Sequence, residues 1–252
     1  MMSSKEILTI QNLGDLRYFL SHRRVDYPPT EVDVTHILKL CNALWLHSGD
    51  PARPHVELTT VELTTGDCSN GFVDVLRALC YTDLCEFFAR HLAGKVLSKL
   101  EEFQFEEEIE WVVGSDHAGA ALSHSVASWF GVRHDFTEKA GPDGKEQVWR
   151  RFAVGEHDPV LQIEDLVTSS KTLLAVRRGM RDGNANPISF VPAVGALVHR
   201  SDVYEIEGAP IVYLVHYDIA KWKKEECPLC AAGSERIIRP KSKENWAKLT
   251  AP

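Results

Sequence analysis

The segment VLQIEDLVTSSKT, residues 160–172, combines the residue types that bind a phosphorylated sugar. A mostly apolar run ends in two adjacent carboxylates, Glu164 and Asp165, which can accept hydrogen bonds from a sugar diol and help to hold Mg²⁺ by way of bound water. A turn rich in hydroxyl groups follows and opens a helix, whose first N–H groups and positive dipole end suit a phosphate. The alternative is structural, with the acidic pair ending a strand and Ser169 capping a helix.

The surrounding chain predicts how this segment is positioned. From residue 111 onward, short apolar runs alternate with helical patterns, which indicates a parallel sheet with helices on its faces. In such sheets, ligands bind beyond the carboxyl ends of the strands. The predicted strands are residues 110–114, 132–138, 147–152, 159–163 and 188–200, and the predicted helices are residues 117–131 and 168–183.

The first hundred residues are expected to be mostly helical. Thr30 can cap a helix with Asp33 in the capping-box position, and the apolar spacing from Val34 to Trp45 extends that helix until Gly49. Residues 82–100 form an amphipathic helical pattern. The sequence VELTT occurs twice in tandem over residues 56–65 and favours a strand or hairpin.

Length and composition narrow the class of protein. The 252 residues, 44% hydrophobic and 25% charged, fit one large globular domain or one with a small appendage. A balance of 28 basic against 36 acidic residues, a net charge of −8, disfavours nucleic acid and anionic membrane surfaces as partners. No apolar run is long enough to cross a membrane, no signal peptide is expected, and six cysteines without such a signal suggest reduced thiols in the cytoplasm.

The segment 160–172 resembles the phosphoribosyl-pyrophosphate (PRPP) motif of type I phosphoribosyltransferases. It differs in two places, since Gln162 stands at a usually apolar position and Ser170 where the family normally has glycine. By this resemblance, the PRPP-binding residues here are Glu164, Asp165, Thr168, Ser169, Ser170, Lys171 and Thr172.

Two further segments extend the resemblance in the family's order. WVVGSDHAGAAL, residues 111–122, is similar to the loop that binds the diphosphate, which implies that role for Ser115, Asp116, His117, Ala118 and Gly119. Residues 132–152 are similar to the catalytic loop and its flanking strands. There, Lys139 matches the basic catalytic position and Lys145 lies further along.

Three details narrow the resemblance to the orotate branch. Residues 64–79 are similar to a segment whose aromatic residue, here Phe72, lies against the pyrimidine, although Asp67 replaces a common lysine. ALVHRSD, residues 196–202, resembles the segment whose arginine takes the orotate carboxylate, here Arg200. The tail with Cys-Pro-Leu-Cys resembles the ending of one bacterial and archaeal subgroup. Together the segments span roughly residues 55–235.

The resemblance implies an α/β type I phosphoribosyltransferase fold, with a central parallel sheet, flanking helices and a hood built from the terminal regions. We expect a helical segment 1–54 (hood or dimer contact), a phosphoribosyltransferase domain 55–235 and a tail 236–252. The implied activity is the cytoplasmic orotate phosphoribosyltransferase reaction of pyrimidine synthesis, by a homodimer that binds PRPP, orotate and Mg²⁺ by way of Glu164 and Asp165. In that reaction, Lys139, Glu164 and Asp165 are catalytic, and Phe72, Thr168 and Arg200 contact the base.

Two other functions remain open. The PRPP motif serves the whole superfamily, so the chain could act on another base. The departures at Asp67, Ala118, Gln162 and Ser170 also fit a PRPP-binding regulatory or interaction protein with weak catalysis.

Cys227 and Cys230 form a CxxC pair, which can be half of a zinc site, a redox pair or a plain turn with reduced thiols. A structural zinc ion needs four ligands, and no second CxxC lies nearby. Cys80 and Cys85 can complete the site only if the fold brings them close.

Overall fold

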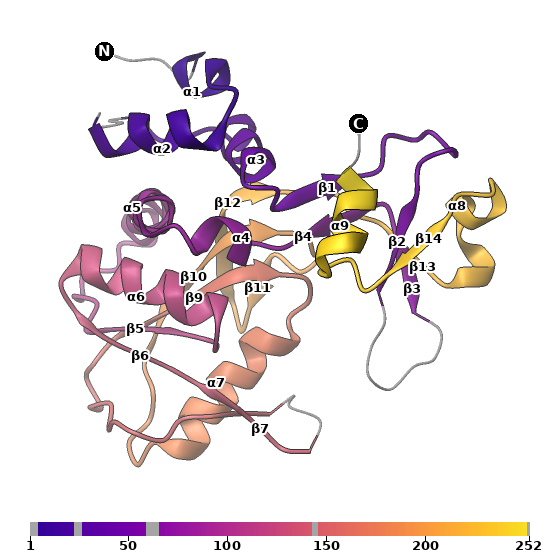
Figure 1. Ribbon diagram of the computed structural model, residues 1–252. Coiled ribbons are helices and arrows are strands. Elements are labelled where there is room, and N and C mark those ends of the chain that lie inside the picture. The colour runs from indigo at the N-terminus through magenta and orange to yellow at the C-terminus, as the bar shows by residue number, and fades with distance from the viewer. Residues whose placement is uncertain (1–4, 23–26, 59–65, 143–145, 251–252) are drawn as a thin grey trace. The chain divides into compact units, whose positions relative to one another are not determined.

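The computed structural model describes residues 5–22, 27–58, 66–142 and 146–250 (Figure 1). The chain forms two compact units. The larger unit comprises Met1–His36 and Leu79–Tyr217, and the smaller unit comprises Ile37–Ala78 and Asp218–Pro252. These divisions differ from the predicted segments 1–54, 55–235 and 236–252, because the smaller unit combines two stretches that are distant in sequence. The role of residues 1–54 as a hood or dimer contact stays a prediction.

The larger unit contains a six-stranded sheet. Its strands and the helices beside them are labelled in Figure 1. Its order is β11-β12-β10-β9-β5-β6, and its described pairs are parallel except that of β11 with β12. The prediction of a parallel sheet is therefore confirmed. The strands are β5 (Trp111–Gly114), β6 (Arg133–Phe136), β9 (Val160–Val167), β10 (Phe190–His199), β11 (Glu205–Ile206) and β12 (Ala209–His216).

Helices cover both faces of this sheet. Gly195 of β10 faces Leu92 of α5, whereas its neighbours Val194 and Ala196 pack with Leu173 of α7 on the opposite face, because successive residues of a strand alternate sides. Helix α6 lies beside α5 and contacts β5 and β9. The helices of this unit are α1 (Lys5–Thr9), α2 (Leu13–His22), α5 (Thr82–Glu102), α6 (Ala118–Phe130) and α7 (Lys171–Gly183). None of the described helices is both long enough and apolar enough to span a membrane.

A short antiparallel hairpin of β7 (Glu138–Ala140) and β8 (Glu146–Val148) follows β6. The strand predicted over residues 147–152 ends at Val148. Its next residue, Trp149, is buried against Trp111 in the core, and its indole N–H donates to a backbone carbonyl, which turns the chain out of the hairpin.

Helix α3 (Glu31–Leu40) begins as predicted and ends earlier. The Thr30 N–H donates to Asp33 Oδ2 at 2.8 Å and the Asp33 N–H to Thr30 Oγ1 at 3.3 Å, which is the expected capping box. The predicted continuation to Gly49 is wrong. Asn42 has a φ of 51°, a left-handed conformation that ends the helix, and Trp45 lies in strand β1 (Leu44–Leu46).

The smaller unit contains a four-stranded sheet in the order β13-β3-β2-β14 and the separate pair β1-β4. Its core comprises Trp45, Val56, Phe72, Ile237, Trp246 and Leu249. Of the VELTT repeat, residues 56–58 end strand β2, and residues 59–65 lie outside the described part. The remaining elements are α4 (Leu76–Leu79), which crosses into the larger unit, and β2 (His55–Leu58), β3 (Asp67–Ser69), β4 (Gly71–Val73), β13 (Lys221–Trp222), η1 (Lys224–Glu226), α8 (Pro228–Ala231), β14 (Arg236–Ile238) and α9 (Lys243–Thr250).

Candidate active site at the strand ends

The predicted segments of the larger unit follow the carboxyl ends of four adjacent strands. Ser115 follows β5, Thr168 follows β9 and Arg200 follows β10, while Lys139 lies just beyond β6. Because these strands are parallel neighbours, their carboxyl ends share one edge of the sheet. That edge is where open α/β sheets bind ligands.

The acidic pair and the diphosphate-loop segment are in direct contact. Glu164 Oε1 accepts a hydrogen bond from Ser115 Oγ at 2.8 Å and from the Asp165 N–H at 3.1 Å. A Cβ atom at Gly119 would lie 2.5 Å from Ser115 Oγ and 2.7 Å from Glu164 Oε1. Only glycine allows the start of α6 to approach the carboxyl group this closely.

The carboxyl group of Glu164 lies in an environment that disfavours its negative charge. Its side chain is buried, and Oε2 has no hydrogen-bond partner in the described structure. Burial, together with the neighbouring Asp165 carboxylate, raises the pKa of Glu164 well above its ordinary value. A ligand that brings hydroxyl donors or a cation to this carboxyl would stabilise its ionised form.

The turn of residues 168–172 leads into α7, and within it the Lys171 N–H donates to Ser169 Oγ at 3.4 Å. The Leu174 N–H donates to Ser170 O at 2.9 Å, so the N–H groups that precede it have no acceptor one turn back within the helix. Ser170 has φ −68° and ψ −11°, an ordinary helical conformation. A serine therefore adopts this position without strain. The side chains of Thr168, Lys171 and Thr172 are exposed.

Gln162 replaces a usually apolar residue for a structural reason. Its side chain is buried, its amide donates to Leu173 O at 3.0 Å, and its Oε1 accepts from Arg177 Nε at 3.0 Å. Arg177 in turn pairs with Glu207 at 3.0 Å. This link between β9 and α7 was not predicted from the sequence. Its available signal was an arginine on the apolar face of α7, between Val176 and Met180.

The diphosphate-loop segment also contacts the hairpin that follows β6. Lys139 Nζ lies 3.2 Å from Asp116 Oδ1, and His117 Nε2 lies 3.4 Å from Asp116 Oδ2. His117 has a φ of 57°, and Ala118 begins α6. The structure thus brings together Asp116, His117 and Lys139, whereas Lys145 lies outside the described residues.

Arg200 is a buried cation at the end of β10. The backbone N–H of Arg200 donates to Val167 O at 2.9 Å, which fixes the end of β10 beside the end of β9. Its side chain is only 8% exposed, and Nε has no hydrogen-bond partner among the described residues. Burial lowers the pKa of the guanidinium. An anion that reached this side chain would satisfy both its charge and its free donor.

Phe72 belongs to the smaller unit. Its ring is packed in that unit's core, edge to face with Trp246 at 5.9 Å between ring centroids. Asp67 pairs with Lys223 at 2.7 Å. The predicted contact of Phe72 with a base stays a prediction.

Cys227 and Cys230 lie in the same unit, at the start of α8.

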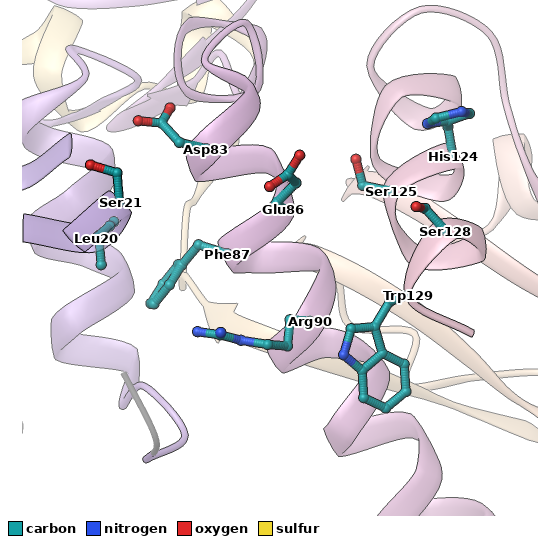
Figure 2. A pocket seen from close by; sticks show the side chains of 10 residues that line it. All are labelled: Leu20, Ser21, Asp83, Glu86, Phe87, Arg90, His124, Ser125, Ser128 and Trp129. Atoms are coloured by element: carbon teal, nitrogen blue, oxygen red, sulfur yellow. The ribbon is translucent and has the colours of Figure 1, made fainter. Parts of the chain in front are cut away.

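A separate pocket lies between α2, α5 and α6 (Figure 2). Its volume is about 550 Å³, and none of the predicted phosphate-binding or base-binding residues is among those that line it. Figure 2 shows Arg90 beside Trp129 at one end and Asp83 and Glu86 along α5. The free donors and acceptors described above lie instead at the strand ends, and we place the candidate active site there.

Comparison with known proteins identifies the family. No protein-family model matches the chain. Orotate phosphoribosyltransferase of Caldanaerobacter subterraneus subsp. tengcongensis is 30% identical over 182 residues, which cover 72% of this chain and 88% of that protein. The enzyme of Heliobacterium modesticaldum is 31% identical over 175 residues, covering 69% and 85%. This chain belongs to the orotate phosphoribosyltransferase family.

A solved structure shows the same fold. Leishmania donovani UMP synthase aligns with this orotate phosphoribosyltransferase family member at a TM-score of 0.50 and 15% identity, over 88% of this chain and 41% of that chain. Family and fold together confirm the predicted type I phosphoribosyltransferase architecture.

Proposed function

We propose that this protein catalyses the reaction of orotate with PRPP to give orotidine 5′-monophosphate and diphosphate, in the cytoplasm, as a step of pyrimidine synthesis. The observation that carries the proposal is the contact of the Glu164 and Asp165 segment with Ser115 and Gly119, at the sheet edge of a chain of this family.

Catalysis would depend on positioning and on charge stabilisation. The bond between ribose C1′ and the diphosphate breaks as a cationic ribosyl transition state develops. Glu164 and Asp165 accept hydrogen bonds from the ribose hydroxyls and so fix the position of the sugar relative to the reacting groups. N–H groups and hydroxyls from Thr168 to Thr172 bind the 5′-phosphate at the start of α7.

The leaving diphosphate would lie against residues Ser115 to Gly119. Backbone N–H groups of this turn face its oxygens, and Lys139 neutralises its developing charge. Lys139 currently pairs with Asp116. It would exchange that carboxylate for diphosphate oxygens when the substrate binds, which also brings the hairpin over the reacting bond and excludes water.

The base would be selected by Arg200 and Thr168, and a contact of Phe72 with the base stays an expectation from the family resemblance. The Nε donor of the buried Arg200 guanidinium has no partner among the described residues, which suits a bidentate contact with the orotate carboxylate. Uncharged bases would leave this buried cation unpaired, which disfavours them.

The residues present fit Mg²⁺. The unpartnered Glu164 Oε2 and the neighbouring Asp165 carboxylate are oxygen ligands of the kind that this hard cation prefers, directly or by way of water. When bound, Mg²⁺ supplies positive charge to the phosphate oxygens. We also expect a homodimer, which light scattering of the purified chain can test.

The test is turnover of orotate, followed as loss of its absorbance in the presence of PRPP and Mg²⁺. We expect activity in the natural chain and a loss of about 10²-fold or more in Asp165→Asn, because the ribose is no longer held in register. Asp182→Asn, on the exposed surface of α7, is the matched control and should retain activity.

Two results would contradict the proposal. Turnover of another base but not of orotate would indicate a phosphoribosyltransferase of different specificity. Binding of PRPP in a calorimeter without turnover of any base would indicate a regulatory PRPP-binding protein.

A further inference from the structure

Four potential metal ligands converge in the smaller unit, and none of them has a role in the proposed reaction. His55 lies in β2, Cys68 in β3, and Cys227 and Cys230 at the start of α8. Their ligand atoms all lie within 4.8 Å of one another. The His55, Cys68, Cys227 and Cys230 set is called the Cys₃His cluster below.

The distances within the Cys₃His cluster match a tetrahedral zinc site. With Zn–S near 2.3 Å and Zn–N near 2.05 Å, a tetrahedron places two sulfurs about 3.8 Å apart and sulfur about 3.6 Å from nitrogen. The Sγ atoms of Cys68 and Cys230 are 3.6 Å apart, and His55 Nε2 lies 3.8 Å from Cys227 Sγ and 3.4 Å from Cys230 Sγ.

The hydrogen bonds of His55 select the tautomer that can bind a metal. Ser234 Oγ donates its proton to Arg53 O at 2.6 Å, so at its 2.8 Å contact with His55 Nδ1 it must accept. Nδ1 therefore carries the ring proton, and Nε2 presents a lone pair to the three sulfurs. An oriented histidine whose other nitrogen donates a hydrogen bond is typical of metal ligands.

The two cysteines at α8 are also arranged for a metal. The Cys230 N–H points to Cys227 Sγ at 3.4 Å, so a backbone donor faces this sulfur within the CxxC turn. His55, Cys68 and Cys227 are buried and Cys230 is half-buried. With four protein ligands and little exposure, the cluster has the form of a structural site with no position open to substrate.

The other cysteines do not join this cluster in the described structure. Cys85 Sγ is 3.3 Å from Ser125 Oγ, and Cys80 is exposed; both cysteines belong to the larger unit. The CxxC pair is instead completed by His55 and Cys68.

We propose that His55, Cys68, Cys227 and Cys230 bind one Zn²⁺ in a structural site that ties β2 and β3 to the C-terminal segment of the chain. Each cysteine thiol releases its proton as its sulfur joins the metal, and His55 binds through Nε2. The ion would hold together two stretches of the smaller unit that are separated by more than 150 residues of sequence, and so would contribute directly to its folding.

The first experiment measures metal in the full-length protein, purified under reducing conditions without chelator, by mass spectrometry of the elements. We expect about one zinc per chain, and only a small fraction of that in Cys68→Ser and in Cys230→Ser. Cys80→Ser makes the same chemical change outside the cluster and should retain zinc.

A second measurement does not depend on whether the variants fold. Cobalt(II) is added in place of zinc to the natural chain, and its absorption spectrum is recorded. We expect the intense visible bands of tetrahedral cobalt and the sulfur-to-metal charge-transfer bands of thiolate ligands, and zinc should displace them. In the same protein, a chelator should lower the unfolding temperature by removing the ligand of the folded state.

Three results would overturn the proposal. The first is a folded, metal-free chain that gives no thiolate–cobalt spectrum. The second is a disulfide between two cluster cysteines in the purified protein, found by peptide mapping. The third is stoichiometric content of a metal other than zinc. Orotate turnover plays no part in these readouts, so the zinc site and the proposed reaction can fail independently.

Discussion

The strand-end site of the larger unit and the Cys₃His cluster of the smaller unit satisfy their polar groups in opposite ways. At the strand ends, Glu164 Oε2 and Arg200 Nε are buried and have no hydrogen-bond partner in the part of the chain that the structure describes. In the Cys₃His cluster, the ring proton of His55 has its acceptor in Ser234, and the remaining lone pair and thiols face one another. The strand-end site leaves donors and acceptors for a substrate that binds and dissociates. In the Cys₃His cluster, the ligand atoms all point toward one position that a single ion can occupy.

This difference predicts how a ligand changes the stability of each unit. Unsatisfied buried groups destabilise a free enzyme and are satisfied only when the substrate binds, so they favour turnover. A closed cluster of thiols gains its stability from a resident ion. Substitutions at the strand ends should therefore change kinetics more than folding, and substitutions in the cluster should do the reverse.

The largest effect is expected for Arg200→Ala. Removal of one partner from a buried charge pair costs about 2–5 kcal/mol, which is roughly a 30- to 5,000-fold fall in kcat/KM for orotate. The affinity for PRPP alone, measured by calorimetry, should change little. Arg178→Ala removes an exposed arginine of α7 and serves as the control. Equal losses in both variants would contradict the assigned role of Arg200.

A smaller change is expected for Ser234→Ala, which removes the acceptor of the His55 ring proton. Loss of such a partner typically weakens metal affinity by about 10- to 100-fold. Competition with a chromophoric zinc chelator measures this affinity. Ser98→Ala, on the exposed side of α5, should leave it unchanged. Unaltered zinc affinity in the Ser234 variant would show that the tautomer argument is wrong.

Gly119→Ala should disturb folding and catalysis together, because its methyl group would collide with Ser115 Oγ and Glu164 Oε1. Overpacking of this kind costs about 1–3 kcal/mol of stability, and displacement of Glu164 should also raise KM for PRPP. Denaturant unfolding and steady-state kinetics measure the two effects. The control is Gly94→Ala, in open space on α5, which should stabilise the protein by about 0.5–1 kcal/mol.

The smallest effect at neutral pH is expected at His134. Burial, with a contribution from His124, lowers the pKa of His134 from 6.5 to about 4. Between these values the folded protein binds fewer protons than the unfolded chain, so stability falls as the pH drops from 6.5 towards 4. His134→Asn should reduce this slope by at most about 1.4 kcal/mol per pH unit, measured by denaturant unfolding at several pH values. Burial likewise lowers the pKa of His91 to about 4, so part of the slope should remain. An identical slope in the variant would contradict the assignment, and exposed His157→Asn is the control.

Much of the larger unit was predictable because its signals are local. Each apolar strand run, the capping box at Thr30 and the acidic pair followed by hydroxyl residues lie within a few positions of one another. Once a parallel sheet is inferred, the ends of its strands meet at one edge without further information. The errors were also local, since propensity alone could not show that Asn42 turns left-handed or that Trp149 leaves the hairpin for the core.

Residue types and short spacings thus determined the family, the sheet and the residues at its edge, because each segment carries its own chemistry and a regular fold aligns the segments. Only the tertiary structure placed Arg177 against Gln162 and brought His55 and Cys68 to Cys227 and Cys230. These contacts join residues that are separated by 15 positions for Gln162 and Arg177 and by 162 positions for Cys68 and Cys230. No period or motif in the sequence specifies these pairings, although Arg177 on the apolar face of α7 was a signal for one of them. Each contact forms only where packing within its own unit fixes the backbone.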